Sequence, residues 1–182
     1  NTLKDVSWAK LKYVYDIAQP SIVIPKEIIF TDKLEDILKD PEVKGVIIAI
    51  PTKYIFDITK KCLESGKHVL MEKPMTENSE KAKQLINIAN EKKLILMIGH
   101  IFIHHPAIKK LKEIIESGEL GKIIHIYSQR IAPGPVRNKD EINALWDLAP
   151  HDISIYLYLL GKEPDKINGF GSSFLRREIL DS

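Results

Sequence analysis

The sequence is poor in cysteine, in long apolar runs and in clustered positive charge. Its 182 residues include a single cysteine, Cys62, which excludes an internal disulfide framework and predicts a reducing, cytoplasmic environment. No apolar run approaches the roughly 18 residues that a membrane span needs, so we expect no membrane partner. The formal net charge is only +2 and the lysines are scattered, which argues against nucleic acid as a partner.

The first part of the sequence alternates short apolar runs with helical patterns. Residues 45–50 form a continuous apolar run, as in parallel strands that are buried on both faces. Shorter runs at residues 11–15, 28–30, 68–71 and 94–98 predict further strands, and the segments after residues 31, 51 and 78 have helical spacing. We expect Ser79 to cap the last of these helices and Gly66 to end the one before it. This rhythm predicts βαβ units and a parallel sheet over residues 1–99.

The pattern changes at residue 100. Helices are predicted at residues 106–117 and 146–160, and strands at residues 122–130 and 167–175. We therefore expect a second, α+β domain over residues 100–182.

Polar residues follow several of the predicted strands. In parallel α/β sheets, ligands bind beyond the carboxyl ends of the strands. The residues at these ends are expected to contact a cofactor, and they are Asp16, Pro51, Thr52, Glu72, Lys73 and His100. A carboxylate at Asp16 would accept from ribose hydroxyls and repel a 2′-phosphate, which favours NAD over NADP.

Asp147 and His151 lie four residues apart on a predicted helix and therefore share one face. A histidine is the natural general base for a hydroxyl proton, whereas the alternative interpretation is a surface ion pair or a helix cap. Lys73 precedes a proline at a strand end, where its ammonium would favour a substrate alkoxide. The alternative for Lys73 is an ordinary surface lysine.

Three histidines, His100, His104 and His105, follow the predicted fifth strand. The spacing of the first two is compatible with a metal site. No cysteine or well-placed carboxylate completes a ligand set, so we expect no metal and favour substrate contacts or structural roles.

Five motifs occur in one order along the chain. They are Glu72-Lys73-Pro74, Gly99-His100, His105-Pro106-Ala107, the stretch from Gly118 to Lys122, and Trp146-Asp-Leu-Ala-Pro-His151-Asp152. This ordered set resembles the family of glucose–fructose oxidoreductase, inositol dehydrogenase and rhizopine-catabolism proteins (Gfo/Idh/MocA). The resemblance extends over nearly the whole chain.

The resemblance implies a Rossmann domain followed by a domain with a mostly antiparallel sheet. It implies an NAD(P)-dependent oxidoreductase in which Lys73, Asp147 and His151 are catalytic, with a cis bond between Lys73 and Pro74. The stretch from Asn143 to Asp152 looks most like enzymes that oxidise nucleotide-linked amino sugars at the 3-position. The residues expected to contact such a substrate are Lys73, Arg130, Arg137, Asn143 and Trp146. The intact protein is expected to be a homo-oligomer.

The sequence departs from the family pattern in specific places. It contains no Gly-x-Gly-x-x-Gly turn, and Ile103 stands where many relatives have arginine. We expect the first strand and the pyrophosphate-binding turn to be missing, the second domain to be incomplete, and the chain to be a fragment. The alternatives are an inositol or free-sugar dehydrogenase, and a truncated homologue without catalytic activity.

Overall fold

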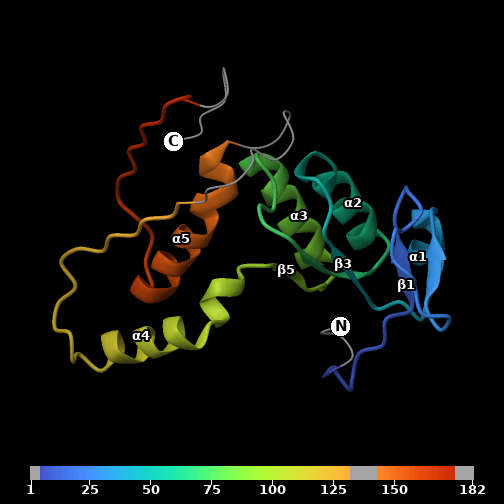
Figure 1. Cartoon of the computed structure of the whole chain (residues 1–182), viewed down its shortest axis with the longest axis horizontal. Coiled ribbons are helices and arrows are strands. Elements are labelled where there is room, and N and C mark those ends of the chain that lie inside the picture. The colour runs from blue at the N-terminus through green and yellow to red at the C-terminus, as the bar shows by residue number, and fades with distance from the viewer. Residues whose placement is uncertain (1–4, 132–142, 175–182) are drawn as a thin grey trace. The chain divides into compact units, whose positions relative to one another are not determined.

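The computed structural model describes residues 5–131 and 143–174 (Figure 1). The chain divides into two compact units. The first comprises Asn1–Met71 with Asn78–Met97, and the second comprises Glu72–Glu77 with Ile98–Ser182. The short segment Glu72–Glu77 is thus grouped with the second unit. The main division lies between Met97 and Ile98, two residues before the boundary between residues 99 and 100 that we expect from the sequence.

The first unit contains five short strands, close to the predicted positions. β1 (Tyr13–Tyr15) pairs in parallel with β2 (Ile29–Thr31), and β3 (Gly45–Ile48) pairs in parallel with β4 (His68–Met71). β5 (Leu96–Ile98) lies on the other side of β4. The described strands therefore form two separate sheets, with the orders β1-β2 and β3-β4-β5. The α/β, Rossmann-like part of the expected fold is present.

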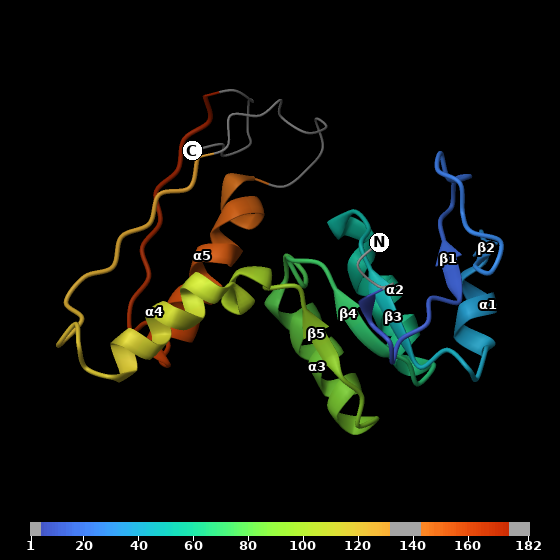
Figure 2. The ribbon, with the colours of Figure 1, turned by 60° about the horizontal axis from the view of Figure 1, so that its bottom comes forward.

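Three helices cover this unit: α1 (Leu34–Lys39), α2 (Thr52–Glu64) and α3 (Ser79–Glu91). α2 packs against α3 and against β3 and β4 (Figure 2). Their apolar faces meet the inward side chains of the strands, and the fully buried side chains include Ile55, Leu63, Val69, Met71 and Leu85. Cys62 is also completely buried, so it is part of this core.

The expectation that the central strands are buried on both faces is wrong for the described structure. Ile48 and Met71 are buried, but their neighbours Ile47, Leu70 and Met97 are 57%, 37% and 44% exposed. Ile47 and Leu70 are partners in the β3–β4 register and so share one face of the sheet. Successive side chains of a strand point to opposite sides, and α2 covers the face that carries Met71, which Thr59 of α2 contacts.

Helix ends confirm one predicted stop and correct one predicted start. Gly66 follows α2 with a φ of 78°, the left-handed conformation that glycine adopts most easily. The N-cap of α3 is Asn78 and not Ser79, since the Asn78 side chain accepts a hydrogen bond of 3.0 Å from the Lys81 amide. Either residue type suits this position, and the backbone geometry selects the earlier one.

The second unit is built from η2 (Ile101–His104), α4 (Pro106–Glu116) and α5 (Ala144–Leu160). α5 packs against both η2 and α4. The Lys112 ammonium on α4 donates a hydrogen bond of 3.1 Å to the Leu159 carbonyl near the end of α5. Gly161, with a φ of 64°, ends α5 where the sequence predicts.

The strands predicted at residues 122–130 and 167–175 do not form in the described part of this unit, which ends at residue 174. Both segments are extended and mostly exposed. A strand is stabilised by the hydrogen bonds of a neighbouring strand, and neither segment is paired in this way. The antiparallel sheet that the resemblance implies is therefore not seen among the described residues.

Candidate active site

Lys73 lies in the segment after β4 and is grouped with the second unit. Its ammonium donates a hydrogen bond of 3.0 Å to Asp147 Oδ1, and it also bonds the Asp147 backbone oxygen. The Lys73 side chain is only 16% exposed, whereas that of Asp147 is 56% exposed. The Lys73–Pro74 peptide bond is cis, as expected. The structure thus brings together two of the three residues that the sequence predicts to be catalytic.

Asp147 lies in the first turn of α5. Asn143 caps this helix, because its side-chain oxygen accepts a hydrogen bond of 3.0 Å from the Trp146 amide. Pro150 lies inside the helix and has no amide hydrogen for the Trp146 carbonyl one turn earlier. The Trp146 carbonyl therefore lacks its usual helical donor, and the next carbonyl, that of Asp147, accepts from Lys73.

His151 follows Asp147 by one turn of α5 and lies in a partly buried environment. Its ring contacts the Phe102 ring edge-on, with the centroids 4.8 Å apart and an interplanar angle of 88°. Burial lowers the pKa of His151 below its ordinary value of 6.5, and the positive charges of Lys73 and Arg130 lower it further. Both effects favour the neutral form of the His151 imidazole, which is the form that accepts a proton.

Two imidazole nitrogens in the second unit are buried without a hydrogen-bond partner among the described residues. They are Nδ1 of His151 and Nδ1 of His100. Burial also lowers the pKa of His100. Because buried polar atoms are usually hydrogen-bonded, these two nitrogens are exceptions among the buried side-chain atoms of the described residues.

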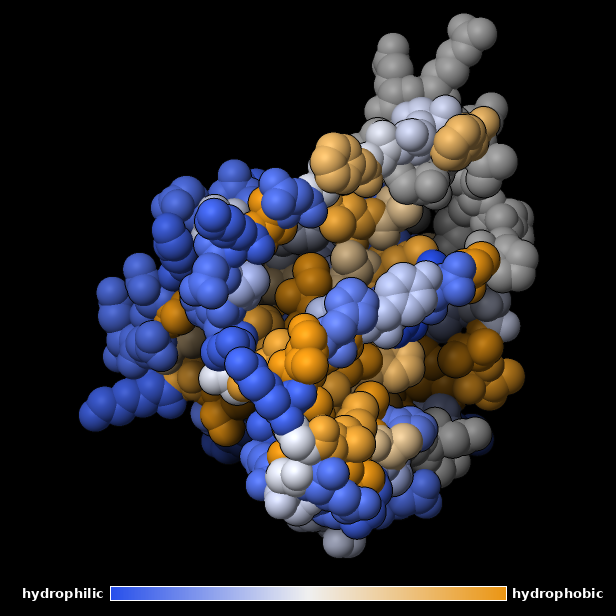
Figure 3. All heavy atoms as spheres, turned by 90° about the vertical axis from the view of Figure 1, so that its left-hand side faces the viewer, coloured by the Kyte–Doolittle hydropathy of each residue, from blue (hydrophilic) through white to orange (hydrophobic). Residues whose placement is uncertain are grey.

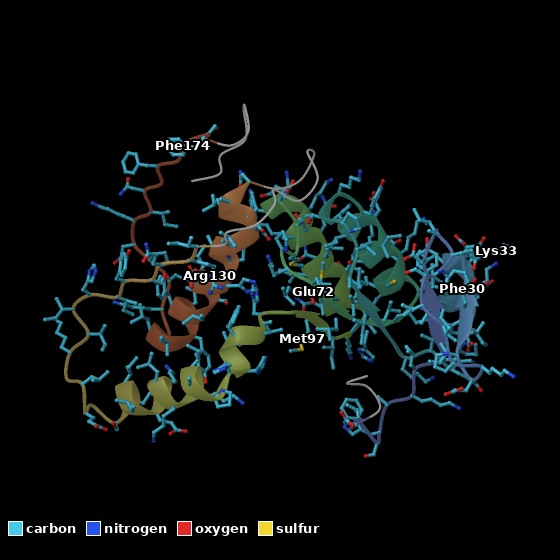
Figure 4. All side chains as sticks on the ribbon, in the orientation of Figure 1. Phe30, Lys33, Glu72, Met97, Arg130 and Phe174 are labelled. Carbon is cyan, nitrogen blue, oxygen red and sulfur yellow. The ribbon has the colours of Figure 1, made fainter. Side chains whose placement is uncertain are left out.

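Arg130 and Asp152 form an ion pair that acts on His151. The Arg130 side chain is labelled in Figure 4. Arg130 Nε donates to Asp152 Oδ2 at 2.9 Å, and its Nη2 donates to Oδ1 at 3.0 Å. The guanidinium also lies over the Phe102 ring, 4.9 Å from its centroid. Sequence reasoning assigned no role to Asp152 or Phe102. The available signal was the carboxylate directly after His151 in a motif that was already singled out.

The predicted cofactor residues Asp16, Pro51 and Thr52 lie in the first unit. Asp16 follows β1 and is exposed, with one carboxylate oxygen accepting a hydrogen bond of 3.0 Å from the Ala18 amide. Pro51 and Thr52 begin α2 directly after the third strand region. All three positions follow the carboxyl ends of strands, which is where ligands bind in parallel α/β sheets. A glycine-rich turn for the pyrophosphate is not part of the sequence.

The remaining predicted residues are less informative. Glu72 is exposed, Trp146 is half-buried, and Arg137 lies outside the described residues. In the parts of the chain that the structure describes, no group of three histidine, cysteine, aspartate or glutamate residues is arranged to hold a metal ion. No helix described here is long and apolar enough to cross a membrane.

Comparison with known proteins identifies two matching domain types. Residues 9–100 match the oxidoreductase family with an NAD-binding Rossmann fold, GFO/IDH/MocA. Residues 108–182 match the GFO/IDH/MocA C-terminal domain. The two matches together extend over most of the chain and include every predicted catalytic residue.

Individual relatives agree with this result. UDP-N-acetylglucosamine 3-dehydrogenase of Acidithiobacillus ferrooxidans is 37% identical over 71% of this chain and 40% of its own length. A solved structure of that enzyme has a TM-score of 0.72 and 32% identity, over 84% of this chain and 48% of the other. The scyllo-inositol 2-dehydrogenase (NAD(+)) of Bacillus subtilis is 32% identical over 75% of this chain and 41% of its own length.

The chain thus spans less than half the length of these curated relatives. The family models nevertheless match both of its parts, and the motifs around Lys73, Asp147 and His151 lie inside the matched residues. The chain belongs to the GFO/IDH/MocA oxidoreductase family, whose members are NAD(P)-dependent and whose named relatives act on sugars, inositols and nucleotide sugars.

Proposed function

We propose that this chain carries the acid–base residues of an NAD-dependent dehydrogenase that oxidises a nucleotide-linked amino sugar at a ring hydroxyl. The observation that carries the proposal is the contact of the Lys73 ammonium with Asp147, one helical turn from His151. An ammonium, a carboxylate and a neutral imidazole are the groups that a hydroxyl oxidation requires.

Each side chain has a specific part in this chemistry. His151 removes the hydroxyl proton, and its lowered pKa keeps it in the neutral, proton-accepting form at pH 7. Lys73 donates a hydrogen bond to the substrate oxygen and stabilises the negative charge that develops there. Asp147 holds the Lys73 ammonium in place. When bound, NAD would accept the hydride from the carbon that bears this oxygen.

The domain roles follow from this assignment. The first unit would bind the dinucleotide, with Asp16 at the adenine ribose. The carboxylate of Asp16 would repel a 2′-phosphate, which favours NAD over NADP. The second unit would bind the sugar, with Asn143, Trp146 and Arg137 at the start of α5 and in the segment before it. We expect the complete enzyme to be a homo-oligomer.

The nucleotide-sugar substrate is supported by the relative from A. ferrooxidans, which is named for that activity and has the highest identity of those described above. The B. subtilis relative favours an inositol as the second candidate. We expect both candidate reactions to use Lys73, Asp147 and His151, so substrate turnover has to separate the two candidates.

A chimera provides the test of the proposed function. The 182 residues would replace the aligned part of the A. ferrooxidans enzyme, which supplies the remaining segments, and NADH formation would be measured with UDP-N-acetylglucosamine, its uronate, free hexoses and inositols. We expect turnover of the nucleotide sugars, with a loss of about 10²–10⁴-fold in kcat for His151→Ala. The control Lys83→Gln removes an exposed lysine paired with Glu80 and is expected to keep full activity. Turnover that is unchanged in His151→Ala would contradict the proposal.

A further inference from the structure

His151 is held in the structure by a chain of side-chain contacts that begins at its sequence neighbour. Asp152 binds the Arg130 guanidinium through two hydrogen bonds of 2.9 and 3.0 Å. The guanidinium lies over the Phe102 ring, and the ring in turn meets the imidazole of His151 edge-on. These four residues come from three segments: η2, the extended segment before residue 131, and α5.

Each of these side-chain contacts restricts the orientation of the groups that it joins. The two parallel hydrogen bonds fix the plane of the guanidinium, because a planar fork meets a carboxylate in one geometry. A cation over an aromatic face and a T-shaped ring pair are both attractive and directional. The Arg130 and Asp152 side chains are only 28% and 19% exposed, so solvent screens their pairing less than that of a surface pair.

We propose that Arg130 and Phe102 are positioning residues for His151, held by Asp152, which set the plane of the imidazole and the charge around it. This inference rests on the proposed role of His151 as the base and adds the residues that aim it. It gives Arg130 a task other than the substrate contact expected from the sequence, since two of its donors are engaged by Asp152.

The electrostatic part follows from the groups that surround His151. Lys73, Arg130 and His100 lower its pKa, and Asp152 raises it, while Asp147 lies one turn away on the same helix. The Arg130–Asp152 pair therefore acts on the imidazole with two charges of opposite sign. Removal of either partner exposes the charge of the other.

The test is an NMR titration of the His151 Cε1–H signal in the 182-residue chain, and it requires no enzymatic activity. Arg130→Gln is expected to raise the pKa of His151, because the Asp152 carboxylate is left uncompensated. Asp152→Asn is expected to lower it, because the guanidinium is left uncompensated. A purely structural role would not produce shifts of opposite sign.

The orientation is tested separately from the charge. Arg130→Lys keeps the positive charge but loses the planar fork, so we expect a changed ring-current shift of His151 with a smaller change of pKa than in Arg130→Gln. Phe102→Leu is expected to abolish that ring-current shift and to raise the pKa as water reaches the imidazole. Phe56→Leu is the matched control, since Phe56 pairs with Lys81 at 5.0 Å in the first unit and its loss is expected to leave His151 unchanged.

The proposal is overturned if the shift and pKa of His151 are the same in the parent, Arg130→Gln, Asp152→Asn and Phe102→Leu chains with folded amide spectra. If Arg130→Gln fails to fold, Arg130→Lys and Asp152→Asn decide the matter. A chimera that oxidises no sugar, together with the expected titration shifts, would refute the proposed function and leave this positioning role intact.

Discussion

At the scale of single residues, Lys67 is a buried cation that stabilises backbone turns. Lys67 is only 5% exposed. Its ammonium donates hydrogen bonds to the Asp40 carbonyl at 2.6 Å and to the Val43 carbonyl at 2.9 Å. It therefore joins the segment between α2 and β4 to the turn that precedes β3. Burial of an ammonium is costly unless its hydrogen bonds are made, and these two carbonyls make them.

We predict that Lys67→Met destabilises the chain by about 2 kcal/mol, because two partly buried carbonyls lose a charged donor. Chemical denaturation of the variant and the parent measures this difference. Lys44→Met is the matched control, since Lys44 also donates to a carbonyl, that of Pro41, but on the exposed surface, and we expect a change below about 0.5 kcal/mol. Equal effects of the two substitutions would mean that burial is not the cause.

The residues proposed to be catalytic show which contacts local sequence patterns do not predict. The spacing of Asp147 and His151 predicts a shared helix face, and α5 provides that helix. The contact between Lys73 and Asp147 joins positions 74 residues apart in the sequence. No local pattern encodes such a pair, so it was expected only from the order of the family motifs.

At the scale of elements, helix caps distinguish neighbouring residues of similar propensity. Both Asn78 and Ser79 are suitable caps for α3, but only the Asn78 side chain accepts from the Lys81 amide. Asn78 has extended backbone angles, φ −133° and ψ 119°, while Ser79 is already helical. An N-cap requires the non-helical conformation.

We predict that Asn78→Ala destabilises the chain by about 1 kcal/mol, whereas Ser79→Ala has almost no effect. Thermal or chemical unfolding of the two variants beside the parent gives the comparison. A larger loss in Ser79→Ala would show that α3 begins one residue later in solution than in the structure.

The strands show where local patterns are insufficient. The run at residues 68–71 forms β4, and the last three residues of the run at 94–98 form β5, because each lies beside another strand. The alternating run at residues 122–130 has comparable β-propensity but no paired neighbour. Strand formation depends on such neighbours more than on propensity.

At the scale of the whole molecule, large apolar side chains remain exposed in the second unit. Ile124, Tyr127, Ile131 and Phe170 are between 74% and 101% exposed. Ile124, Tyr127 and Phe170 belong to the segments that were expected to form a sheet, and Ile131 directly follows the first of these segments. Figure 3 shows apolar side chains gathered over the middle of the face that it presents. An exposed apolar area of this kind is typical of a surface that another layer of protein covers.

We predict that the 182-residue chain binds NAD weakly or not at all and has no dehydrogenase activity by itself. The β1-β2 and β3-β4-β5 sheets are separate in the described residues, and the sequence has no glycine-rich turn to donate backbone hydrogen bonds to a pyrophosphate. Calorimetric titration with NAD measures the binding, and the chimera with the A. ferrooxidans enzyme is the positive control. Micromolar binding by the 182-residue chain would contradict this prediction.

The sequence by itself determined the βαβ character of the first unit, the helices α4 and α5, and the spacing of Asp147 and His151. These features depend on periodicity and on caps, which act over a few neighbouring residues. Only the tertiary structure decided that Lys73 contacts Asp147, that Arg130 pairs with Asp152 over Phe102, and that Ile47 and Leu70 remain exposed. The physical reason is that such contacts join distant segments, and whether a side chain is buried depends on the layer that packs against it.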